Sequence, residues 1–169
     1  MNAPVILDRR RVLAGGGALI VSFSLNQAFA EEQGAPTAAP APKPPGSLAT
    51  SPYLDSWIHV DADGSITVFT GKVEIGQGFK TAFQQIAAEE LDVPFASLKV
   101  VTADTNRTAN EGYTSGSQSM QYSGTAIQNA AAQVRELLVA EAARRFDLPA
   151  ENLRTENGAV IAPDGQRLG

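Results

Sequence analysis

The chain has 169 residues, which favours a single domain, and 43% hydrophobic with 18% charged residues is the composition of an ordinary globular protein. Its formal charge is −5, and residues 1–30 carry +2, so the remainder carries −7 and lacks the basic face that a nucleic-acid-binding protein needs. The lack of cysteine excludes disulfides and iron–sulfur ligation by this chain, and a single histidine, His59, argues against a histidine-based zinc site.

Residues 1–30 have the pattern of an export signal. Three arginines at positions 9–11, then Val12 and Leu13, precede an apolar run over 14–25, and residues 28–30 fit a small-x-small cleavage site. Paired arginines before a leucine are typical of the twin-arginine signal, which exports proteins already folded around a cofactor. Asp8 stands where Ser or Thr is more usual, which leaves a Sec signal or an uncleaved anchor as the alternative. We expect a periplasmic protein exported by the twin-arginine route.

Residues 31–53 are predicted to be a linker, because five prolines between positions 36 and 45, interleaved with alanine, favour an extended chain that buries little surface. The domain proper is expected over 54–169. Its last residues follow a turn signal, Pro163-Asp164-Gly165, with no closing element, so we expect the domain to be incomplete.

The patterns in the body predict an α+β fold with the element order β-β-α-β-α-β-β. Turn residues 61–64 and 156–158 separate pairs of short β-prone runs, and apolar residues recur at helical spacing in two longer segments. We expect one mixed sheet with two main helices packed on it. The predicted ranges are strands at 57–60, 65–70 and 98–102, a helix at 79–91, a loop at 104–114, a helix at 123–146 and a hairpin over 153–161.

Two glycine-rich and polar patches stand out. The first patch is Gly71–Gly78 (Gly-Lys-Val-Glu-Ile-Gly-Gln-Gly), and the second patch is Tyr113–Ser119 (Tyr-Thr-Ser-Gly-Ser-Gln-Ser). Each precedes a predicted helix, whose first backbone N–H groups lack partners and favour an anion. Glycine lets a ligand approach the backbone, while hydroxyl and amide side chains add donors. We therefore expect the two patches to converge on one phosphate-bearing ligand, and plain turns with a helix cap are the alternative.

Other familiar sites are not supported. Gly76-Gln77-Gly78 is followed by Thr81 rather than glycine at the third position, so the dinucleotide fingerprint of the Rossmann fold fails, and no P-loop motif is present. Glu74 lies inside the first patch and Glu111 flanks the long loop, but neither has a partner at a spacing typical of acid–base pairs. The sequence therefore nominates no catalytic residue and no metal ligand.

The linked motifs resemble the molybdenum-cofactor-binding subunit of the xanthine dehydrogenase/aldehyde oxidase superfamily. They are the first patch, residues 85–91 with Pro94, Asp104-Thr105, and residues 111–119 with Gly124. The resemblance covers 57–169 and is strongest to the branch of the large (beta) chains of isoquinoline 1-oxidoreductase and related periplasmic aldehyde and nicotinate dehydrogenases. It implies that the following residues contact the pterin dinucleotide: Gly76, Gln77, Gly78, Gly116, Ser117, Gln118 and Ser119, with Ser115 as a weaker transfer.

The same resemblance implies a molybdenum–molybdopterin dinucleotide cofactor in its cytosine form. It implies hydroxylation of an aldehyde or N-heterocycle with water as the oxygen source, and a catalytic glutamate in a segment that this chain lacks. The expected partners are a small [2Fe-2S] subunit, a membrane cytochrome c subunit and a small-molecule substrate, with no nucleic acid. On this interpretation the chain is the N-terminal part of a larger oxidoreductase subunit and is inactive alone.

Two other functions remain open at this point. The chain could be a non-catalytic exported protein that completes a split enzyme, or a periplasmic binding module for another phosphorylated ligand. Both would use the two patches without the remaining machinery of a hydroxylase.

Overall fold

The computed structural model describes residues 43–169. The predicted signal segment and linker residues 31–42 lie outside this range. Residues 46–49, within the predicted linker, form a 3₁₀ turn, and Leu48 in it is 2% exposed and belongs to the main core. The indole Nε1 of Trp57 donates to the carbonyl oxygen of Ser51 at 2.9 Å, which ties this entry segment to the domain.

A βαβ unit forms the centre of the domain. Strand β1 (Ile58–Val60) pairs antiparallel with β2 (Ile66–Thr70) across the predicted turn, and β2 pairs in parallel with β3 (Leu98–Thr102). Helix α2 (Phe79–Leu91) connects the two parallel strands, with the bounds that the sequence predicted. Asp92, at φ 53°, ends the helix in the left-handed conformation, and Pro94 follows it.

The second helical segment begins earlier than predicted. A short helix α3 (Gly116–Gln118) continues through a π-helical turn at Ser119–Gly124 into α4 (Thr125–Phe146). The predicted start at Ser123 was therefore seven residues late. A π turn has no distinct signature in hydrophobic spacing, and it is frequent at functional sites.

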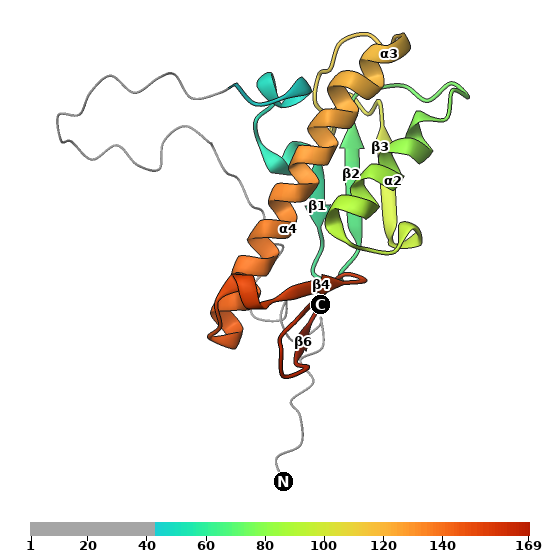
Figure 1. Ribbon diagram of the computed structural model, residues 1–169. Helices are drawn as coiled ribbons and strands as arrows, with labels where there is room; N and C mark the ends of the chain where they lie inside the picture. The colour runs from blue at the N-terminus through green and yellow to red at the C-terminus, as the bar shows by residue number, and fades with distance from the viewer. Residues whose placement is uncertain (1–42) are drawn as a thin grey trace, which may run out of the picture.

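The strands form two sheets rather than the one sheet that we expected. The first has the order β1-β2-β3, and the second has the order β4-β5-β6, with β4 (Arg154–Glu156), β5 (Ala159–Ile161) and β6 (Arg167–Leu168) antiparallel. The 22 residues of α4 span roughly 33 Å. Figure 1 shows this helix, in orange, running alongside the first sheet and ending next to the second sheet. Strand β6, which pairs with β5, is an element that the sequence did not predict.

The core lies between the first sheet and the two long helices. Trp57, Val68, Phe83 and Ile127 are each fully buried there. A smaller hydrophobic cluster joins α4 to the second sheet. It consists of Ala142 of α4, Val160 of β5 and Leu168 of β6. The main core therefore supports the carboxyl ends of β2 and β3, from which both patches emerge.

Candidate functional site

The parallel pairing of β2 and β3 brings the two patches together. Thr70 and Thr102 are register partners at the carboxyl ends of these strands. The first patch follows Thr70 directly, and the loop that leads to the second patch follows Thr102. In doubly wound α/β proteins, ligands bind outside the carboxyl ends of parallel strands, and the patches occupy this edge (Figure 1). The two patches therefore lie at the same edge of the sheet, while their convergence on one ligand stays a prediction.

The buried side chain of Lys72 connects the two patches. This side chain is 2% exposed, and its Nζ donates to the carbonyl oxygens of Glu111 at 2.6 Å and Tyr113 at 2.8 Å. Beside it, the backbone N–H of Val73 donates to Oγ1 of Thr114 at 2.8 Å. A buried ammonium needs such acceptors, since it has lost its water. Lys72 thus fixes the separation of the patches.

Glu111 provides the second connection. Its Oε2 accepts from Oγ1 of Thr70 and from the backbone N–H of Gly71, both at 2.7 Å, and its Oε1 accepts from Oγ of Ser123 in the π turn. One carboxylate therefore joins the end of β2, the long loop and the helical segment after the second patch. Local spacing could not reveal these partners, because Thr70 and Gly71 lie 41 and 40 residues before Glu111.

The Glu111→Gln variant should lower the free energy of unfolding by about 2 kcal/mol, because hydrogen bonds to a charged acceptor are worth about 1.5–3 kcal/mol and the amide is neutral and keeps only one acceptor oxygen. Chemical denaturation followed by Trp57 fluorescence would measure this loss. The exposed Glu89→Gln variant is the matched control and should change stability by less than about 0.5 kcal/mol. Equal stability of the two variants would show that Glu111 does not hold the site.

The first patch forms a tight turn that its own side chains stabilise. Gly76 and Gly78 have φ angles of 98° and 83°, which favour glycine. Oε1 of Glu74 accepts from the N–H groups of Gly76 and Gly78 at 2.7 and 3.0 Å, and Oε2 accepts from that of Lys80 at 2.9 Å. These bonds, with those to Lys80 and Gly78 the largest, lower the pKa of Glu74 below its usual value.

Gln77 closes the same turn. Its Nε2 donates to the carbonyl oxygen of Val73 at 2.8 Å, and its Oε1 accepts from the N–H of Ile75 at 2.7 Å. The side chain nevertheless lies on the surface. An exposed amide with both ends on its own loop can exchange those bonds for bonds to a ligand with little other rearrangement.

The second patch presents most of its polar groups to solvent. Ser115, Ser117 and Gln118 are exposed, and Oγ of Ser115 donates to Oε1 of Gln118 at 3.1 Å. Gly116 has a φ of 30°, again in the region that favours glycine. Ser119 differs from the others because it is only 4% exposed, at the start of the π turn.

Sequence reasoning missed Lys72 and Glu111 as the residues that assemble the site. Their charge alone did not single them out, because Glu74 in the first patch is charged as well. The partners of Lys72 and Glu111 depend on strand register. Among residues 43–169, no group of three His, Cys, Asp or Glu side chains is arranged to hold a metal ion.

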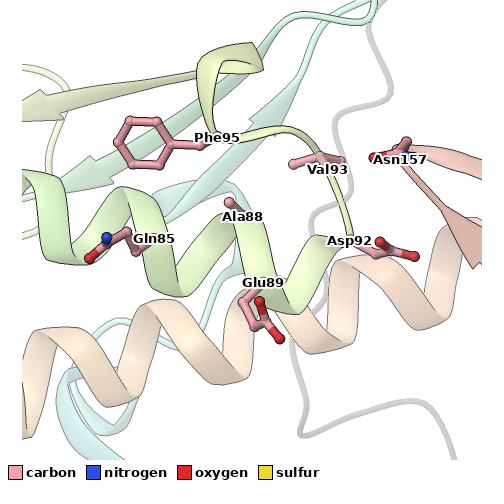
Figure 2. Close-up of a pocket in the computed structure, with 7 residues that line it drawn as sticks. All are labelled: Gln85, Ala88, Glu89, Asp92, Val93, Phe95 and Asn157. Atoms are coloured by element: carbon pink, nitrogen blue, oxygen red, sulfur yellow. The ribbon is translucent and has the colours of Figure 1, made fainter.

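Two hollows lie elsewhere on the domain. Figure 2 shows one of about 520 Å³ at the carboxyl end of α2, where Glu89, Asp92 and Asn157 face it together with Phe95. The other, of about 210 Å³, is largely apolar and lies between the two sheets, with Leu138 and Val160 in its lining. Neither contains a residue of the two patches. In the part of the chain that the structure describes, none of the helices is long and apolar enough to cross a membrane.

Comparison with known proteins identifies the family of this chain. The family described as "Molybdopterin cofactor-binding domain" matches residues 23–168. A nicotinate dehydrogenase subunit of Pseudomonas putida is 35% identical over 161 residues, which are 95% of this chain and 13% of that protein. The beta subunit of isoquinoline 1-oxidoreductase of Brevundimonas diminuta is 32% identical over 166 residues, or 93% of this chain and 20% of that protein.

The fold has a solved counterpart in quinoline 2-oxidoreductase from Pseudomonas putida 86. The match has a TM-score of 0.55 and 28% sequence identity, and it covers 62% of this chain and 13% of that chain. The chain therefore spans about a fifth or less of the length of these relatives.

Proposed function

Because this chain belongs to the family of molybdopterin cofactor-binding domains of xanthine dehydrogenase-type oxidoreductases, we propose that it is the N-terminal part of the cofactor-binding subunit of an exported molybdenum hydroxylase. The observation that carries the proposal is the direct contact between the two patches, in which Lys72 donates to the carbonyl oxygen of Tyr113 and the N–H of Val73 donates to Thr114. One ligand can reach both patches at once.

The patches fit a dinucleotide. At Gly76, Gly78 and Gly116 the backbone takes a positive φ, and an added Cβ would meet no atom within 4 Å. The glycine backbone is thus open to a bulky ligand, and the exposed Gln77 amide and Ser117 hydroxyl can add polar contacts to it. The residues proposed to hold the molybdopterin dinucleotide are Gly76, Gln77, Gly78, Gly116, Ser117, Gln118 and Ser119.

The bound cofactor would supply the oxidative hydroxylation chemistry, and this chain would bind and orient it. Lys72 and Glu111 contribute indirectly, since they hold the patches at a fixed separation before the ligand arrives. No side chain of the described residues is assigned as the catalytic base. The names of the nicotinate, isoquinoline and quinoline enzymes favour an N-heterocycle as the substrate class, with an aldehyde as the second candidate.

The partners and location belong to the same proposal. We infer a [2Fe-2S] subunit and a membrane cytochrome c subunit for electron transfer, a cytosine dinucleotide form of the cofactor, and export to the periplasm through the arginines at positions 9–11. The cysteine-free sequence is consistent with iron–sulfur clusters on another chain. Mass spectrometry of the natively purified complex would give chain lengths, partners and cofactor together.

The Gln77→Ala and Ser117→Ala variants should each lower molybdenum and pterin content about tenfold at limiting cofactor, the effect of losing one hydrogen bond to a charged ligand. Both side chains are exposed, and the hydrogen bonds of Gln77 stay within its own turn, so the thermal midpoint of the whole fold should change little. Metal analysis and pterin fluorescence of the purified complex would measure occupancy.

Gln85→Ala, an exposed glutamine on α2 outside both patches, is the control and should keep full occupancy. A wild-type complex without molybdenum and pterin would refute the proposed function. It would favour a binding module for another phosphorylated ligand.

A further inference from the structure

Helix α2 begins without an ordinary cap. Its N-cap residue is Gly78, which has no side chain that could accept a hydrogen bond and which has a left-handed φ of 83°. Ser, Thr, Asp or Asn usually fills this position and accepts from the first free N–H groups of the helix. In this chain the N-cap residue cannot supply that acceptor.

Glu74 supplies the missing acceptor from four residues upstream. Its two carboxylate oxygens accept from the N–H groups of Gly76, Gly78 and Lys80 at 2.7–3.0 Å. The bond to Lys80 reaches the first turn of α2, and the other two close the turn before it. The negative charge also lies at the end of the helix where the macrodipole favours it.

These contacts determine the shape of the surface that a ligand meets. The two glycines adopt positive φ angles and leave open space where a side chain would be. Such a turn is entropically costly to order, because glycine has the largest conformational freedom in the unfolded chain. A carboxylate that accepts three N–H groups reduces that freedom before binding, and preordering raises affinity without a new contact to the ligand.

The geometry points to Glu74 as a positioning residue: we propose that its carboxylate holds the Gly76-Gln77-Gly78 turn in the shape that presents the glycine backbone and the Gln77 amide to the pterin dinucleotide. The inference rests on the proposed function. It differs from acid–base catalysis, because both carboxylate oxygens already accept backbone N–H groups. It also differs from direct ligation, because those oxygens point into the turn.

The test compares Glu74→Ala, Glu74→Gln and wild type in the full-length subunit with its partners. In cofactor-free enzyme, prepared without molybdate, amide hydrogen exchange of the peptide over 73–81 should be about fivefold faster in Glu74→Ala. Molybdenum and pterin content at limiting cofactor should fall by a similar factor. Glu74→Gln keeps one acceptor oxygen and should lie between the other two. The exposed Glu136→Ala on α4 is the control and should match wild type.

The outcomes distinguish failure of the proposed function from failure of the positioning role of Glu74. If wild type contains no molybdenum or pterin, the proposed function fails, whatever the exchange rates show. If wild type is loaded and Glu74→Ala is loaded equally or better, the positioning role is wrong and the carboxylate is either a structural cap or a competitor of the ligand. If Glu74→Ala does not fold, the exchange rates and cofactor content of Glu74→Gln are compared with wild type instead, because glutamine has the same size as glutamate. Equal loading of Glu74→Gln and wild type, with equal exchange rates, would then contradict the positioning role.

Discussion

The Gly71→Ala variant should lose about 3 kcal/mol of unfolding free energy and should open the contact between the patches. A Cβ at this position would lie 2.2 Å from the carbonyl oxygen of Ala109 and 3.3 Å from the backbone nitrogen of Glu111. The obstacle is backbone, so it cannot rotate away, and overpacking of this kind costs about 1–3 kcal/mol or more. The shift would also disturb the hydrogen bond from the Gly71 N–H to Glu111. Urea unfolding followed by fluorescence of Trp57, which is fully buried, measures the loss.

Gly124→Ala is the matched control. Gly124 lies in the π turn with a helical φ of −58°, and an added Cβ would make ordinary contacts of 3.5–3.6 Å with Phe83, Ile86 and Met120. Replacing glycine by alanine inside a helix is expected to be neutral or to stabilise by up to about 1 kcal/mol. If both variants are equally stable, the close approach at Gly71 does not limit the fold.

The Lys72→Met variant should lose about 2–4 kcal/mol and should separate the two patches. Methionine has a similar length and fills the buried space, but it leaves the carbonyl oxygens of Glu111 and Tyr113 without their donor. An unsatisfied buried acceptor costs about 1–3 kcal/mol. The measurements are the denaturation midpoint, for stability, and hydrogen exchange of the peptide over 111–119, for the contact between patches.

Lys99→Met provides the comparison, because Lys99 is an exposed lysine on the edge strand β3. Its replacement should change stability by less than about 0.5 kcal/mol. A Lys72→Met variant that matches Lys99→Met would contradict the role of the buried ammonium. Loss of stability with unchanged exchange over 111–119 would place the effect of Lys72 elsewhere in the fold.

These predictions share one physical basis. The two patches consist mainly of glycine and small polar residues, which bury little apolar surface and cannot hold a shape through packing. Lys72 and Glu111 replace packing with charge-assisted hydrogen bonds beneath the surface. Within the first patch, the carboxylate of Glu74 and the neutral amide of Gln77 make hydrogen bonds with the same effect. Open glycine backbone and a fixed overall shape can therefore coexist, as a bulky ligand requires.

The sequence by itself determined the local elements. Helix Phe79–Leu91 was predicted to its observed bounds, because a glycine precedes it and Pro94 follows it. Strand Leu98–Thr102 was predicted with the same accuracy. The hairpin at Asn157-Gly158 has φ angles of 52° and 77°, which this residue pair favours in any context. Each of these features depends on neighbours within a few residues.

Tertiary structure decided how these elements combine. The strands form two sheets, and β6 is the third strand of the second sheet. Helical structure begins at Gly116, within the second patch. Above all, parallel pairing of β2 with β3 placed Lys72 and Glu111, which lie 39 residues apart, in one network. Local sequence identifies which segments are glycine-rich or helical. Only strand register, set by burial of the whole core, decides which segments meet and hence which charges are paired.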